Sequence, residues 1–213
     1  MASSIIHMAV ANEINKIIRK DRKSILIGSI APDIGKHVGI SKVVSHFEIV
    51  DDDIPKLDVF LDKYKAYLND DFVLGYYIHL YTDYLWFKYF VPDFCNNGYV
   101  YKLDGTKVDL SDDEKLKYFY NDYTNLNIKV IDEYNLQLDV FYEEVPEFNN
   151  IIKEIPMDKI KIIVDQAGII LENTKKTKAY IFDMKLVNKF IKTSVECILS
   201  DLKQLGVYWI SDK

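Results

Sequence analysis

One long apolar segment, residues 72–90, limits the folds open to this chain more than any other feature. It is rich in aromatic side chains, and Pro92 closely follows it. Such a segment either crosses a membrane or forms a helix through a globular core. It also contains His79, Asp83 and Lys88, and an ionised carboxylate in the middle of a bilayer is costly. The sequence therefore predicts a buried core helix and no transmembrane segment.

Helical periodicity dominates the rest of the chain, and convincing strands are scarce. A length of 213 residues with 49% hydrophobic side chains fits one domain with a sizeable core. We therefore predict a single compact all-α domain over residues 1–213. Capping and proline signals place helices at residues 3–20, 22–30, 53–68, 70–91, 127–140, 146–155, 158–173 and 183–205, and another beginning at the capping box Ser111–Glu114.

Two stretches interrupt this helical pattern. Residues 33–50 contain Gly35 and Gly39, and we expect an ordered loop there. Residues 99–109 alternate weakly in polarity around Asp104-Gly105, which predicts one small hairpin.

Charge and cysteine usage exclude some classes of protein. Lys and Arg number 27 against 33 Asp and Glu, so the net charge is -6. Proteins that bind nucleic acid usually present a basic face, so this balance argues against nucleic acid as a partner. Cys95 and Cys197 share no short-spacing motif, and no secretory signal opens the chain. Both features predict reduced thiols and a cytoplasmic location.

His79 and Asp83 are the first candidates for chemistry. They are four residues apart in the long apolar segment, so a helix places them on one face, one turn apart. That spacing allows an imidazole and a carboxylate to bind the same ion. A His–Asp hydrogen bond within the core is the more frequent explanation of an isolated pair of this kind. Taken singly, His7, Asp33 and His46 also have ordinary structural explanations.

Together these residues follow a recognisable order. His7 comes first, followed by Gly28–Asp33, then Ser45-His46-Phe47 and finally Leu74–Asp83. This pattern resembles the zinc-dependent phospholipase C family, which is related to fungal single-strand nucleases. The resemblance covers roughly the first ninety residues, and no motif can be aligned after Pro92.

The resemblance implies an all-helical fold with a metal cluster at the end of a cleft. It implies that Asp33, His46, His79 and Asp83 surround one zinc ion, and that His7 binds a second metal that shares Asp83. Family members with three metals have two further histidines and a glutamate downstream. This chain has no histidine after His79, so we expect one or two ions and no third.

Some ligands remain open at this stage. His37, in the same stretch as Asp33, is an alternative ligand, although a surface histidine explains it better. The secreted family members also use the amino group of their first mature residue. Whether the amine of this chain reaches the cluster stays open. Two imidazoles and two carboxylates suit zinc, and manganese or iron also fit the oxygen content.

The resulting expectation is a metal-dependent hydrolase that attacks phosphate esters with metal-activated water. Asp33 is then both ligand and proton acceptor, as the resemblance suggests, and the substrate is a small phosphorylated compound. A phosphohydrolase of the HD type needs an adjacent His-Asp pair, which the sequence lacks. A metal-binding protein of the same fold without catalysis is the second alternative. Nothing in the sequence indicates the oligomeric state.

Overall fold

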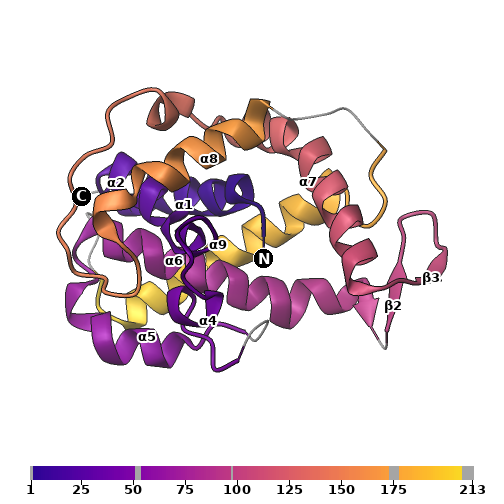
Figure 1. Ribbon diagram of the computed structural model, residues 1–213, viewed down its shortest axis with the longest axis horizontal. Coiled ribbons are helices and arrows are strands. Elements are labelled where there is room, and N and C mark those ends of the chain that lie inside the picture. Colours follow the sequence, from indigo (N-terminus) through magenta and orange to yellow (C-terminus); the bar gives the residue numbers. More distant parts are fainter. Residues whose placement is uncertain (1, 51–53, 97, 173–177, 208–213) are drawn as a thin grey trace.

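The predicted core helix, α6 (Asp71–Leu85), runs through the middle of the molecule (Figure 1). The structure is a computed structural model that describes residues 2–50, 54–96, 98–172 and 178–207. The helices that pack against α6 are α1 (Ser4–Ile18), α2 (Arg22–Gly28), α5 (Leu57–Tyr64) and α9 (Met184–Gln204). The fold is mostly helical, as predicted.

The remaining elements lie around this group. Two further long helices, α7 (Asp112–Tyr134) and α8 (Lys161–Glu172), pack against each other. Short helices are α3 (Gly35–Val38), α4 (Lys42–Ser45), the 3-10 helices η1 (Ala31–Ile34), η2 (Lys65–Tyr67), η4 (Val91–Asp93), η5 (Leu138–Phe141) and η6 (Met157–Lys159), and the π-helix η3 (Trp86–Phe90).

Side-chain caps begin several helices where the sequence predicts them. Ser3, Asp70 and Asp183 each accept a backbone N–H from the first turn of α1, α6 and α9. Ser111 and Glu114 form the predicted capping box of α7. These caps satisfy donors that the helix cannot satisfy itself, so they fix where each helix begins. The predicted start of a helix at residue 53 lies outside the described residues, and α5 begins at Leu57.

A close approach of two backbones joins α2 to α6. A Cβ atom on Gly28 would lie 2.3 Å from the Phe72 carbonyl oxygen, and one on Gly75 would lie 2.4 Å from the Ile25 carbonyl oxygen. Only glycine fits at these two positions. The approach places the C-terminal end of α2, with Ser29 after it, beside the residues of α6 that carry chemistry.

Three expectations about local structure are wrong. Residues 33–50 are not a plain loop, because η1, α3 and α4 form successive short helical turns there. The helix predicted at residues 127–140 is not a separate element. Residues 127–134 are the last part of α7, which runs unbroken from its capping box. Asn135, in the left-handed conformation with φ 48°, ends that helix. Asparagine tolerates this conformation better than most residues, so it is a natural C-terminal cap.

The helix expected at residues 146–155 is also absent from the described structure, which has irregular backbone there. Tertiary contacts explain the difference. Phe148 packs on Phe72 with ring centroids 4.5 Å apart, Ile152 is fully buried, and the Lys153 backbone N–H donates to the Tyr64 hydroxyl. These anchors bind the segment to α5 and α6 and outweigh its modest helix propensity.

The predicted hairpin forms, with an additional strand. β2 (Tyr99–Tyr101) pairs antiparallel with β3 (Lys107–Asp109), and β1 (Cys95–Asn96) pairs with β2 on its other side. The sheet lies at one end of the molecule, beside the start of α7 (Figure 1).

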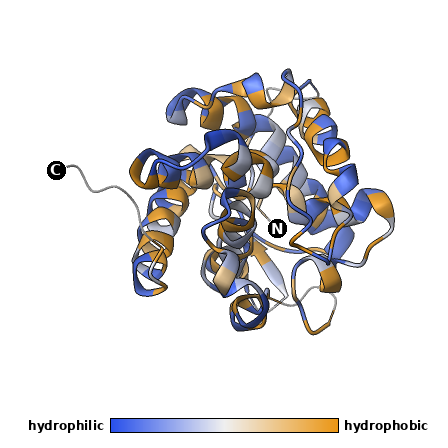
Figure 2. Ribbon diagram, turned by 90° about the vertical axis from the view of Figure 1, so that its left-hand side faces the viewer, coloured by the Kyte–Doolittle hydropathy of each residue, from blue (hydrophilic) through white to orange (hydrophobic). Residues whose placement is uncertain are grey.

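The buried apolar side chains of the described residues form one connected cluster. Figure 2 shows hydrophilic and hydrophobic residues mixed along most helices, as amphipathic helices require. No described helix combines the length and the apolar character needed to span a membrane. Cys95 and Cys197 are free thiols, as predicted.

Candidate metal centre

Helix α6 supplies the first two residues of the centre. His79 and Asp83 lie one turn apart, and both side chains are fully buried. His79 Nε2 is 3.6 Å from Asp83 Oδ2. The Asp70 cap and the packing of Gly75 against α2 hold this helix in place. The face predicted from the spacing of these two residues is therefore buried in the core.

His7 of helix α1 contacts both residues of this pair. His7 Nε2 is 3.3 Å from Asp83 Oδ1, and its ring stacks on the His79 ring with centroids 3.8 Å apart. The backbone N–H of Ala2 donates to the same Asp83 oxygen at 3.0 Å. The start of the chain thus lies against the cluster. Asp83 contacts both α1 and the segment before it.

The segment of short helical turns adds Asp33 and His46. Asp33 lies in η1 directly after Pro32, and His46 is the C-terminal cap of α4. His46 Nε2 is 3.2 Å from His79 Nε2, 3.7 Å from Asp33 Oδ1 and 3.8 Å from Asp83 Oδ2. All five residues predicted as ligands therefore lie in one buried cluster.

Hydrogen bonds on the far side of two imidazoles orient them. His79 Nδ1 donates to the Ser29 carbonyl oxygen at 2.7 Å, and Ser45 Oγ lies 2.9 Å from His46 Nδ1. In both rings Nε2 is left facing the cluster. Metal-binding histidines are commonly held through the second nitrogen in this manner.

The electrostatics favour the protonation states that bind a cation. Burial lowers the pKa of His46 to about 4 and lowers the pKa of His79 well below its usual value. Burial works to raise the pKa of Asp33, but Lys36 and the neighbouring histidines outweigh it and leave this pKa lowered. The pKa of Asp83 is held far below normal against the effect of burial, first by His7. At neutral pH both imidazoles are neutral and both carboxylates are ionised, as metal ligands must be.

The unsatisfied atoms of the cluster test whether a metal ion fits. Asp33 Oδ1 and Asp83 Oδ2 are buried without a hydrogen-bond partner among the described residues. His7 Nε2 lies near Asp83, yet neither nitrogen of His7 meets the directional requirement of a hydrogen bond. Leaving ionised oxygens buried and unpaired is expensive. A cation among these donors would remove that cost, so buried His and Asp groups here can hold a metal ion.

The donors form two overlapping triads, and within each triad the three ligand atoms lie within 4.8 Å of one another. One is Asp33, His46 and His79, and the other is His7, His79 and Asp83. His79 belongs to both triads, and its Nδ1 already donates to Ser29. One nitrogen therefore remains for the cluster, which favours one well-formed ion over two equal ones.

The other candidate ligands lie apart from this cluster. His37 is exposed in α3 and belongs to neither triad, which agrees with a surface histidine. Met1 lies outside the described residues, so the position of its amine is not described.

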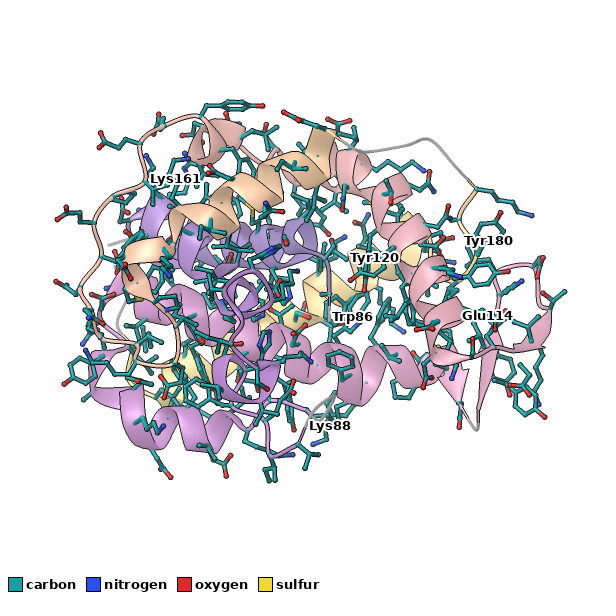
Figure 3. All side chains as sticks on the ribbon, viewed as in Figure 1. Trp86, Lys88, Glu114, Tyr120, Lys161 and Tyr180 are labelled. Atoms are coloured by element: carbon teal, nitrogen blue, oxygen red, sulfur yellow. The ribbon has the colours of Figure 1, made fainter. Side chains whose placement is uncertain are left out.

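A cavity of about 610 Å³ opens beside the cluster. Its lining includes Ala2 and Asp33, and Lys36 and Lys42 add positive charge. Trp86 of η3 and Tyr120 of α7, labelled in Figure 3, belong to its apolar wall. The other apolar or aromatic lining residues are Phe87, Val91, Leu116, Phe119, Tyr123 and Ile170. Ile170 shows that α8 contributes to the wall.

The sequence indicates two residues of this cavity, Asp33 as a ligand and Trp86 as an aromatic residue that could line a pocket, but it did not reveal the others. Lys36 and Lys42 belong to no recognisable motif. Their position between Asp33 and His46, in the segment that carries two predicted ligands, could have indicated that they lie near the site. Asn127 of α7, also in the lining, gave none, because it occupies an ordinary helical position.

Comparison with models of known protein families finds no match, and comparisons with curated proteins and with solved structures find none either. The geometry of the site therefore carries the functional argument.

Proposed function

We propose that this protein is a metal-dependent hydrolase of phosphate esters with a phospholipase C/nuclease-like fold. The observation that supports it is one arrangement: a buried cluster of five metal donors whose Asp33 edge lines a cavity with two lysines. Pockets of this volume suit small ligands. Lysine side chains beside a metal cluster suit a phosphate group.

Asp33, His46, His79 and Asp83 would hold the main ion, and His7 with Asp83 a weaker second one. Three imidazoles and two carboxylates suit zinc best, and manganese or iron also accept such a set. A bound divalent ion supplies Lewis acidity, which polarises phosphoryl oxygens and acidifies water.

The side chains of the protein perform the remaining tasks. The carboxylate of Asp33, which lines the cavity, accepts a proton from the attacking water. Lys36 and Lys42 attract the phosphate. Lys42 is held 2.7 Å from the buried Glu48 carboxylate, and its ammonium lies 4.9 Å from the Phe87 ring centroid. These contacts restrict where its charge lies.

A metal-binding protein without catalysis is the second candidate. Its support is burial, because His7, His79 and Asp83 are fully buried and Asp33 is only 3% exposed. A structural ion is typically enclosed by protein ligands, whereas a catalytic ion keeps a position open for water.

Two measurements on one preparation separate these candidates. Elemental analysis of protein purified without chelator or histidine tag should find one or two equivalents of zinc, manganese or iron per chain. The His79→Asn variant should lose the metal, and the matched variant His37→Asn should keep it. Hydrolysis of p-nitrophenyl phosphate and its diester should then require the metal. Metal without any hydrolysis would support the non-catalytic candidate, and absence of metal would overturn both.

A further inference from the structure

We infer that Asn127 is a substrate-binding residue whose side-chain amide donates a hydrogen bond to a phosphoryl oxygen. The inference rests on the proposed function, because it takes the ligand of the cavity to be a phosphate ester. It adds a specific residue from the C-terminal region, to which no motif of the sequence pointed.

Asn127 lies close to the metal donors through the start of the chain. Ser3 Oγ donates to Asn127 Oδ1 at 3.3 Å, and the preceding residue, Ala2, donates its backbone N–H to Asp83. Two consecutive residues thus connect the cluster to helix α7. Ala2, Ser3, Asp33 and Asn127 all line the same cavity, so a ligand that occupies this cavity is accessible to both Asp33 and the amide.

The amide nitrogen of Asn127 lacks an acceptor. The residue is only 2% exposed, and its Nδ2 has no hydrogen-bond partner among the described residues. Buried amides are almost always paired, and an unpaired one is costly. A ligand that supplies an acceptor would therefore recover this cost on binding.

The contact of the amide with Ser3 involves its oxygen. In the structure Ser3 Oγ accepts the Ile6 N–H as the cap of α1 and donates its own proton to Asn127 Oδ1. That assignment engages the oxygen and leaves the NH₂ group unpaired at the cavity. An NH₂ donor suits phosphoryl oxygens, which are strong acceptors.

The composition of the cavity indicates the remainder of the substrate. Lys36 and Lys42 supply positive charge, whereas Leu116, Phe119 and Tyr120 supply an apolar wall. A phosphate ester of an aromatic or aliphatic alcohol matches both: the phosphate binds at the polar end and the organic group packs on the wall.

The test uses phenylphosphonate, which resembles such an ester and cannot be hydrolysed at its carbon–phosphorus bond. Calorimetry on the metal-containing protein should show binding, and Asn127→Leu and Asn127→Ala should each weaken it by about tenfold or more, as loss of a hydrogen bond to a charged group implies. The matched variant Asn125→Leu, two residues away on the same helix and not in the cavity lining, should bind within about twofold of the wild type.

Folding and metal content are controlled by circular dichroism and elemental analysis of each variant. The inference is overturned if the wild type does not bind phenylphosphonate, or if the Asn127 and Asn125 variants bind alike. Binding that depends on Asn127 without hydrolysis of any phosphate ester would sustain the inference and reject the proposed function. Metal-dependent hydrolysis with an unchanged KM in both Asn127 variants would do the reverse.

Discussion

The N-terminal region (described residues up to 90) and the C-terminal region (described residues from 98 onward) contribute differently to the site. The first supplies all five candidate metal donors, on α1, η1 and α6 and at the C-terminal cap of α4. The second supplies part of the cavity wall, from α7 and α8. Metal binding restricts residue types and spacing, whereas a wall requires only shape and polarity. The first kind of constraint is readable in a sequence and the second is not.

Substitution of Asp83 is expected to have the largest effect on the contribution of the N-terminal region. Its carboxylate lies within 4 Å of three histidine nitrogens and accepts the Ala2 N–H. Asp83→Asn keeps the shape and removes the charge, so we expect loss of bound metal and a fall in phosphatase activity of at least about 100-fold. Elemental analysis and kcat/KM for p-nitrophenyl phosphate measure both effects.

The control for Asp83 is Asp62→Asn, which removes an exposed carboxylate from the neighbouring helix α5. It should leave metal content and kcat/KM unchanged. Full metal content in Asp83→Asn would show that the cluster does not bind its ion through this carboxylate.

A pair of glycine substitutions compares the packing of the two regions. Gly75→Ala would place a Cβ atom 2.4 Å from a backbone oxygen of α2, so we expect a loss of more than about 3 kcal/mol of unfolding free energy, above the usual overpacking range. Gly168→Ala in α8 meets nothing within 4 Å. There the better helix propensity of alanine should add about 0.5–1 kcal/mol.

Urea denaturation of both variants measures these changes. The pair is informative because the substitution is identical and only the surroundings differ. A Gly75→Ala protein as stable as the wild type would mean that α2 and α6 do not approach as closely as described.

The stability of the metal-free protein should depend on pH through two histidines of the N-terminal region. Burial depresses the pKa of His46 to about 4 and holds that of His79 well below its usual value. In the unfolded chain both titrate near 6.5, so below that pH the unfolded state binds protons that the folded state does not. Stability of the metal-free protein is therefore full above about pH 6.5 and falls toward pH 4. His46 alone contributes a loss on the order of 3 kcal/mol.

Denaturation of chelator-treated protein at a series of pH values between 7.5 and 4.5 measures this loss. His46→Gln should flatten the dependence, whereas the exposed His37→Gln should change it little. An equally steep dependence in His46→Gln would show that this imidazole does not titrate as its burial requires.

Particular residues show how far the sequence was informative. The start of α6 at its Asp70 cap, the capping box at Ser111 and the His79–Asp83 face were all predictable, because local spacing determines them. The absence of a helix at residues 146–155 was not, because contacts with α5 and α6 decide it. Asn127 was equally hidden, since its significance comes from the cavity and from its contact with Ser3, which lies more than a hundred residues away in the chain.

In the C-terminal region we expect the buried polar side chains to serve the stability of the fold and not the binding of metal. The buried Asp122 carboxylate accepts the backbone N–H groups of Tyr180, Ile181 and Phe182, which ties the segment before α9 to α7. Asp122→Asn replaces one acceptor oxygen with an NH₂ group that opposes those donors. We expect a loss of about 2 kcal/mol in unfolding free energy.

Metal content should nevertheless remain that of the wild type, because neither candidate triad among the described residues includes a residue of α7 or of the segment it holds. Asp132→Asn removes an exposed carboxylate from the same helix and should change stability by less than about 0.5 kcal/mol. Loss of metal in Asp122→Asn would mean that the C-terminal region supports the cluster as well as the cavity wall. The two regions would then differ in whether their contribution can be predicted from the sequence, but both would support metal binding.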